Sequence, residues 1–188
     1  MAENAPNRGV LPYDRLRARE YARRWAHGRN PLFYNFSGIG GDCTNFVSQC
    51  ILAGCCTMNY TPTFGWYYRS PDDRAAAWSG VQYLYDFLSG NTGPGPFGRQ
   101  VGIDELQLGD VVQLGRGDGS FFHTLLIVGF SRRGYLVAAH SDDAYGRLLP
   151  SYSYRELRPI HIEGFRCPSP PPPECFWPLY NGRALPPG

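Results

Sequence analysis

The sequence contains no lysine, and all 18 of its basic residues are arginine. A chain without lysine has no phosphate-loop lysine, no Schiff-base lysine and no lysine general base. An excess of either charge is also lacking, because 16 acidic residues leave a net charge of only +2. We therefore expect neither nucleic acid nor a membrane as the main partner.

Long hydrophobic runs are absent too. No apolar stretch approaches the roughly 20 residues of a transmembrane helix, and the first ten residues, MAENAPNRGV, lack the apolar stretch of a secretion signal. The sequence as given predicts a cytoplasmic protein, or a secreted one if a leader has been removed.

The cysteines show no framework of paired positions. No CxxC motif occurs, and adjacent cysteines at 55 and 56 have poor geometry for a zinc site or a disulfide. Cys167 and Cys175 flank a proline run, which holds its ends apart. We therefore expect reduced thiols and no metal or organic cofactor. The six cysteines are Cys43, Cys50, Cys55, Cys56, Cys167 and Cys175.

The chain length and the 43% hydrophobic content indicate one folded domain. Apolar spacing predicts helices first and strands afterwards, the order of an α+β fold with N-terminal helices packed on an antiparallel sheet. The expected helices cover residues 13–27, 43–53 and 79–88. The expected strands cover 111–114, 124–130, 135–139 and 159–165, and residues 91–96 are expected to form a loop.

Two terminal segments lie outside this pattern. Residues 1–12 are expected to be flexible, and 13–166 to form the domain. Residues 167–188 form a proline-rich tail, which either packs across the domain through its aromatic side chains or docks a proline-binding partner. We favour packing.

Cys43 is the strongest candidate for a reactive group. It opens the second predicted helix, with Asp42 as N-cap and Gly54 at the end. Unpaired N–H groups and the helix dipole favour the thiolate there, so Cys43 should react below the ordinary thiol pKa, and the same N–H groups can hold an oxyanion. The alternative is a buried structural cysteine.

A nucleophilic cysteine needs a base, and the histidines differ in their positions. His27 and His161 are expected at the surface. His123 opens one strand and His140 closes the next, so an antiparallel hairpin should make them neighbours. Such a pair provides a base and an orienting group, and Asp142 is an alternative orienting residue.

Candidate substrate-binding residues are harder to separate from the core. Asp42 and three aromatic residues (Trp66, Tyr67 and Trp78) are candidates for a substrate groove, but the aromatic residues suit core filling equally well.

Four motifs in this order carry a resemblance to a known family: GGDCTNFVSQ (40–49), LGDVV (108–112), HTLLIV (123–128) and AHSD (139–142). Together they resemble the putative amidase domain family, which is similar to the NlpC-type cell-wall peptidases and CHAP amidases with a compact papain-like fold. The resemblance covers about residues 13–166. It implies Cys43 as nucleophile, His123 as base, and His140 or Asp142 as orienting residue.

The implied activity is that of a cysteine amidohydrolase working through a thioester. The implied substrate is a peptide or peptidoglycan-type molecule, either a bacterial cell-wall peptide or its muramoyl amide. Two alternatives stay open: an acyltransferase using the same cysteine and histidine, and a catalytically silent peptide- or glycan-binding module.

Overall fold

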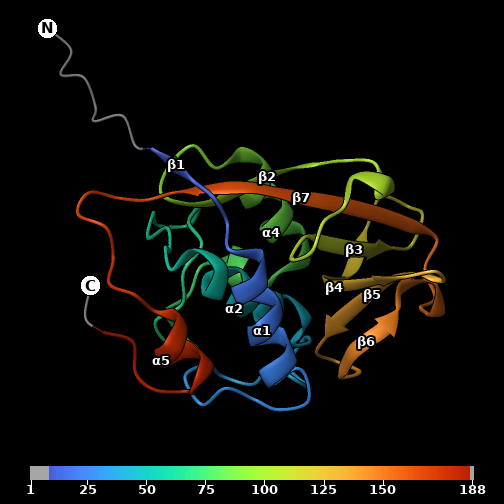
Figure 1. Ribbon diagram of the computed structural model, residues 1–188, viewed down its shortest axis with the longest axis horizontal. Coiled ribbons are helices and arrows are strands. Elements are labelled where there is room, and N and C mark those ends of the chain that lie inside the picture. Colours follow the sequence, from blue (N-terminus) through green and yellow to red (C-terminus); the bar gives the residue numbers. More distant parts are fainter. Residues whose placement is uncertain (1–8, 187–188) are drawn as a thin grey trace, which may run out of the picture.

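One curled antiparallel sheet organises the protein in a computed structural model that describes residues 9–186 (Figure 1). Its strands are β1 (Val10–Leu11), β2 (Gly95–Gln100), β3 (Val111–Gly115), β4 (Phe121–Ser131), β5 (Gly134–Ala139), β6 (Ala144–Leu148) and β7 (Glu156–Arg166). The helices are α1 (Arg15–Trp25), α2 (Cys43–Cys55), α3 (Ala76–Ser79), α4 (Val81–Gly90) and α5 (Phe176–Tyr180), with short 3₁₀ turns at Ile103–Glu105 and Leu149–Ser151. The predicted α+β class is confirmed.

The long strand β7 pairs with β1, β2 and β3. β2 and β3 both pair with Ile160 and so lie on opposite sides of β7. β1 pairs with Phe165 and Arg166 on the side opposite β2. From β3 the sheet continues through β4, β5 and β6, and β7 spans the top of the view in Figure 1.

Alternating side chains give the sheet two apolar faces. Val111 and Leu126 belong to the core shared with the helices, whereas their neighbours Val112 and Leu125 belong to a second, smaller core. This is the two-residue period of a strand. Because both faces are covered, the middle strands are apolar at nearly every position.

Helix α2 is buried along its whole length. Its polar side chains are satisfied inside the protein: Ser48 Oγ accepts from Trp66 Nε1 at 3.0 Å, and Gln49 Oε1 accepts from the Tyr21 hydroxyl at 2.7 Å. A buried polar group needs such a partner to avoid a desolvation cost. α2 is thus a rigid central element, and its first residue is Cys43.

Several predicted boundaries need correction. α2 does not end at Gly54 but continues to Cys55, and Cys56 is its C-cap with a φ of 49°. Residue 54 must be glycine because a Cβ there would lie 2.2 Å from the Tyr13 ring. The helix expected over 79–88 is α4, shifted by two residues, and Gly80 separates it from the short preceding helix α3. The loop expected over 91–96 already contains the start of β2.

The predicted flexible segment 1–12 lies mostly outside the described residues, but Val10–Leu11 form strand β1 and are ordered against β7. The tail packs on the domain as favoured: α5 inserts Phe176 and Leu179 into the core shared by α1 and α2. Figure 1 shows α5 beside these helices.

The prediction of six reduced thiols is wrong. Cys56 and Cys175 form a disulfide across 119 residues of sequence, and the free cysteines are Cys43, Cys50, Cys55 and Cys167. The tail turns back so that α5 reaches the end of α2, where Cys56 begins the exit from the helix. Local spacing pointed only to Cys167 as a partner for Cys175.

Among the described helices, none has the length and apolar character needed to cross a membrane.

Candidate active site

The first turn of α2 presents Cys43 with an uncapped set of backbone N–H groups. Asp42 occupies the N-cap position, but its side chain makes no capping hydrogen bond. The N–H groups of Cys43 and Thr44 instead face the Cys43 sulfur, where they stabilise negative charge. Cys43 itself is 7% exposed.

The sulfur also meets strand β4. Thr44 Oγ1 lies 2.8 Å from Thr124 Oγ1 and 3.8 Å from the Cys43 sulfur, so the thiol lies beside this contact between α2 and β4. On one side Thr124 pairs with Gln113 of β3, whereas the pairing of β4 with β5 begins only at Leu126. The candidate nucleophile therefore lies against the residue that follows His123.

The prediction of a resting thiolate needs correction. Burial raises the pKa of the Cys43 thiol, although the N–H groups of Thr124, Thr44 and Cys43 and the Thr44 hydroxyl act in the opposite direction. Desolvation of the charged form outweighs these donors. Cys43 therefore rests as a thiol and needs a base to remove its proton.

His123 meets the requirement for such a base. It is 8% exposed, and burial lowers the pKa of its imidazole to about 4, with Asp142 raising and Arg147 lowering it. The ring of Tyr152 lies 5.9 Å from the His123 ring. The imidazole is neutral at pH 7 and able to accept a proton.

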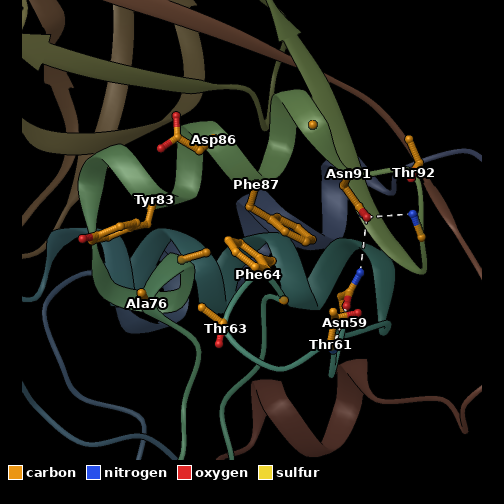
Figure 2. Close-up of a pocket in the computed structure, with 14 residues that line it drawn as sticks. Asn59, Thr61, Thr63, Phe64, Ala76, Tyr83, Asp86, Phe87, Asn91 and Thr92 are labelled. Carbon is orange, nitrogen blue, oxygen red and sulfur yellow. Dashed lines mark hydrogen bonds between the residues drawn. The ribbon is translucent and has the colours of Figure 1, made fainter.

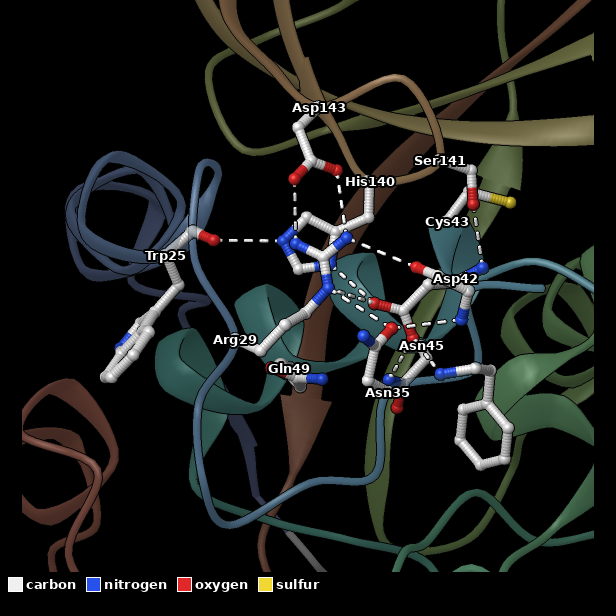
Figure 3. Close-up of polar contacts among 12 residues, drawn as sticks. Trp25, Arg29, Asn35, Asp42, Cys43, Asn45, Gln49, His140, Ser141 and Asp143 are labelled. Atoms are coloured by element: carbon white, nitrogen blue, oxygen red, sulfur yellow. Dashed lines mark hydrogen bonds and ion pairs between the residues drawn. The ribbon is translucent and has the colours of Figure 1, made fainter. Parts of the chain in front are cut away.

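His140 is held in a separate buried network (Figure 3). Its Nδ1 lies 2.6 Å from Asp42 Oδ2, its Nε2 lies 2.9 Å from the carbonyl of Trp25, and Phe46 stacks on its ring at 4.0 Å. Arg29 Nε lies 3.2 Å from the same Asp42 oxygen. A carbonyl oxygen can only accept, so Nε2 of His140 donates to Trp25 while Nδ1 pairs with the Asp42 carboxyl group.

This network bears on the orienting residue. Both nitrogens of His140 are used by Asp42 and Trp25, and no hydrogen bond joins His140 to His123 within residues 9–186. Figure 3 shows the Cys43 sulfur directed away from the His140 ring. Asp142 is the carboxylate whose charge acts on His123. His140 therefore lies at the start of α2, bound to its N-cap residue Asp42, while Asp142 acts on His123 through its charge.

The loop after His140 has an unusual backbone. Ser141 and Asp142 have φ values of 60° and 90°, a conformation that costs energy for residues other than glycine. Ser141 Oγ accepts from the N–H of Asp42 at 2.8 Å, which ties this loop to the start of α2. Two consecutive strained residues beside both candidate catalytic groups mark the loop as part of the site. Ser141 belongs to the AHSD motif without a role that the sequence could assign, and Tyr152 carried no signal in the sequence.

The candidate substrate-binding residues mostly lie in the interior. Trp66 and Trp78 are fully buried, and their indole N–H groups bond Ser48 and Asn45. They fill the core, the alternative that the sequence left open. Asp42 is fully buried with both oxygens engaged, and only Tyr67 is partly exposed.

A separate cavity lies between the 59–65 loop and the helices α3 and α4 (Figure 2). It measures about 580 Å³, and Phe64 and Tyr83 stand at it with 82% and 60% exposure. Neither Cys43 nor His123 lines it, so it is distinct from the candidate active site.

The remaining histidines differ from each other. His27 is exposed as predicted. His161, expected at the surface, is instead partly buried with its Nδ1 2.8 Å from Asp110 Oδ2, beside the pair formed by Arg15 and Asp110. This cluster ties α1 to β7 and not to the candidate site. No three His, Cys, Asp or Glu side chains of the described chain gather as a potential metal site.

The fold and site together define an α+β domain that brings a cysteine at a helix start to a strand carrying a buried neutral histidine. The chain belongs to the putative amidase domain family, whose model matches residues 12–162. The family description points to amide hydrolysis and hence to a hydrolase.

A curated relative is the uncharacterized protein YhbB of Bacillus subtilis (strain 168), which is 35% identical over 122 residues. The match covers 63% of this chain and 38% of YhbB, so the chain spans under two thirds of that relative's length. No solved structure matches the chain.

Proposed function

We propose that this protein is a cysteine amidohydrolase in which Cys43 is the nucleophile and His123 the general base. The observation that carries the proposal is the meeting of the uncapped start of α2 with β4 at Thr124, the residue next to His123. A compact papain-like fold of the NlpC type, implied by the sequence motifs, belongs to the same proposal.

The reaction starts from a neutral pair. His123 takes the proton from the Cys43 thiol as the sulfur attacks the amide carbonyl, and the first-turn N–H groups of α2 hold the resulting oxyanion. The imidazolium then gives its proton to the leaving amine, and a thioester remains. Water, deprotonated by His123, cleaves the thioester to the acid and restores the thiol. The sum is amide plus water giving acid plus amine.

Residues around the pair have supporting roles. The Asp142 carboxylate stabilises the imidazolium that forms on His123, and Arg147 holds Asp142 through an ion pair of 2.5 Å. The Tyr152 hydroxyl is buried with no hydrogen-bond partner among the described residues, and the Arg147 guanidinium covers the Tyr152 ring at 3.8 Å from its centroid. His140 and Asp42 act as positioning residues for the start of α2.

The proposed substrate is a bacterial cell-wall peptide or its muramoyl amide, as the motif resemblance implies. The disulfide between Cys56 and Cys175 supports this choice, because disulfides persist in oxidising compartments such as the cell exterior. We therefore propose that the protein works outside the cytoplasm.

The test uses purified cell-wall sacculi and soluble muropeptides, with products identified by liquid chromatography and mass spectrometry. We expect new amine and carboxyl ends with the wild type and none with Cys43→Ala or His123→Gln. Cys167→Ser and His27→Gln are matched controls, since Cys167 is a free cysteine near the opposite end of α2 from Cys43 and His27 is exposed. Hydrolysis that survives Cys43→Ala would refute the cysteine mechanism.

The same assay separates transfer from hydrolysis. With an added primary amine, a hydrolase continues to release free acid, whereas an acyltransferase gives the new amide. In both cases the intact-protein mass spectrum should show an acyl group attached to Cys43. If wall fragments are cleaved and none of them gives this adduct, the result argues against a thioester intermediate.

A further inference from the structure

A shallow hollow of about 630 Å³ lies at the end of the sheet where His123 is located. It is built by the turn between β3 and β4 and by the segment that enters β7. The Arg155 N–H donates to the Gly115 carbonyl at 3.0 Å, and the Arg116 N–H donates to the Ser120 carbonyl at 3.0 Å, so backbone bonds fix both walls. The lining residues are Gly115, Arg116, Gly117, Asp118, Phe122, Ser153, Tyr154 and Arg155.

A β-bulge connects this hollow to the candidate base. Leu114 pairs with His123 and Gly115 with Phe121, so Phe122 is the extra residue of β4. Bulges re-aim a side chain, and here the rings of Phe122 and His123 lie nearly parallel, 9° apart, with centroids separated by 6.5 Å. Phe122 thus forms a wall of the hollow and a neighbour of His123. Tyr152, which packs on His123, immediately precedes Ser153 of the opposite wall.

Two guanidinium groups give the hollow its charge. Arg116 lies over the Phe122 ring at 4.8 Å, and its one side-chain hydrogen bond is to Ser120 Oγ at 3.4 Å. The Arg155 stem packs on Gly117, where an added Cβ would lie 3.1 Å from Arg155 Cβ and where φ is +83°. Neither arginine has an ion pair among residues 9–186, whereas Arg29 and Arg147 near the site are both paired with aspartates.

The one acidic residue in the hollow is already engaged. Asp118 Oδ1 accepts from the N–H and the hydroxyl of Ser120, which closes the turn. The lining therefore has two cations and one anion, with Phe122 and Tyr154 as flat apolar walls. Planar guanidinium groups match the geometry of a carboxylate.

We propose that this hollow is a specificity subsite in which Arg116 and Arg155 bind a free carboxylate of the substrate beside the scissile amide. The subsite rests on the proposed function for its place in a reaction, but its ligand chemistry is testable without turnover. Such a subsite would make the enzyme prefer peptides with a free side-chain or terminal carboxylate over the same peptides with that carboxylate amidated.

The binding test uses Cys43→Ala protein and two probe dipeptides, N-acetyl-alanyl-glutamate amide and N-acetyl-alanyl-glutamine amide, which differ in one carboxylate. We expect the glutamate probe to bind at least tenfold more tightly by calorimetry or NMR titration. Arg155→Gln and Arg116→Gln in the same background should each remove most of this difference. Arg132→Gln, at the exposed turn between β4 and β5, is the matched control and should change nothing.

The turnover test uses muropeptides with their carboxylates either intact or amidated. Arg155→Gln should raise KM for the acidic form at least tenfold with little change in kcat, and leave turnover of the amidated form unchanged. Equal affinity for the two probes, or equal effects of Arg155→Gln and Arg132→Gln, would overturn the subsite. Discrimination of the probes without any muropeptide hydrolysis would uphold the subsite and count against the proposed function.

Discussion

The imidazole of His123 loses most of its water contact on folding, and this sets the pH at which it changes charge. Burial lowers its pKa to about 4, whereas an unfolded histidine titrates near its ordinary value of about 6.5. Between these two values the unfolded chain binds a proton that the folded chain does not. Acid therefore lowers the stability of the folded state, and near pH 4 it also protonates His123, which can then no longer act as the proposed base.

The first prediction concerns this titration. We expect the acid limb of kcat/KM for muropeptide hydrolysis near pH 4, since His123 must be neutral to accept the thiol proton. Folded-state stability should fall as pH drops from 6.5 towards 4, by up to about 3 kcal/mol. Urea unfolding at pH 7.0, 5.5 and 4.5 measures the fall, which His123→Gln should reduce. An acid limb at pH 6.5 would contradict the buried, neutral imidazole.

The second prediction concerns the thiol of Cys43. Because burial raises its pKa, alkylation by iodoacetamide should be slow at pH 7 and accelerate above pH 9, about the reference value for a thiol. Mass spectrometry of the Cys43 peptide follows the rate, with the partly exposed Cys167 as an internal reference. Rapid alkylation of Cys43 at pH 6, lost in His123→Gln, would instead show a resting thiolate–imidazolium pair.

The third prediction concerns the buried carboxylate of Asp42. It pairs with His140 and Arg29, so Asp42→Asn leaves two donors without their anion and should cost about 3 kcal/mol of unfolding free energy. Asp143→Asn is the control, since Asp143 binds the same Arg29 from a partly exposed position and should cost less than about 1 kcal/mol. Denaturant unfolding measures both, and equal costs would argue against the network as the support of α2.

At the scale of elements, the contact between α2 and β4 fixes the site. The hydroxyls of Thr44 and Thr124 form a buried hydrogen bond beside the Cys43 sulfur. Removing one hydroxyl leaves the other buried without a hydrogen-bond partner, which costs about 1–3 kcal/mol of stability. Removing both leaves two apolar groups of the same shape, so no buried polar group is left unpaired.

The fourth prediction follows from this contact. Thr44→Val and Thr124→Val should each destabilise the protein by about 1–2 kcal/mol, and the double variant should cost less than the sum. Each single variant should also lower kcat, because it loosens the sulfur against β4. A double-mutant cycle on thermal unfolding gives the coupling, and strict additivity would contradict a direct bond between the two hydroxyls.

The elements show where sequence patterns suffice. The strands β3, β4, β5 and β7 were predicted because their apolar runs are bounded by turn residues. β2 was missed because its sequence, GPFGRQ, contains proline and glycine and gains its order from pairing with β7. The full burial of α2 was also beyond prediction, since its polar residues look like a solvated face until their partners are known.

At the scale of the whole molecule, the candidate site depends on contacts that spacing does not reveal. Sequence order predicted Cys43 at a helix start, His123 in one strand and His140 after the next, and the structure has them there. It did not reveal that Asp42 and Trp25 occupy both nitrogens of His140, because these partners lie 98 and 115 residues away. Long-range polar pairing leaves no periodic pattern, so residue spacing alone overestimates the link between the two histidines.

The fifth prediction concerns the disulfide between Cys56 and Cys175, which joins positions 119 residues apart in the sequence. Closing a loop of this length removes about 3–5 kcal/mol of conformational freedom from the unfolded state. Cys175→Ser should therefore lower stability by several kcal/mol, and dithiothreitol should destabilise the wild type but not the variant.

Thiol titration in denaturant should give four free thiols before reduction, namely Cys43, Cys50, Cys55 and Cys167. Six free thiols in protein purified from an oxidising compartment would contradict the link, and with it the support that it lends to a cell-wall substrate.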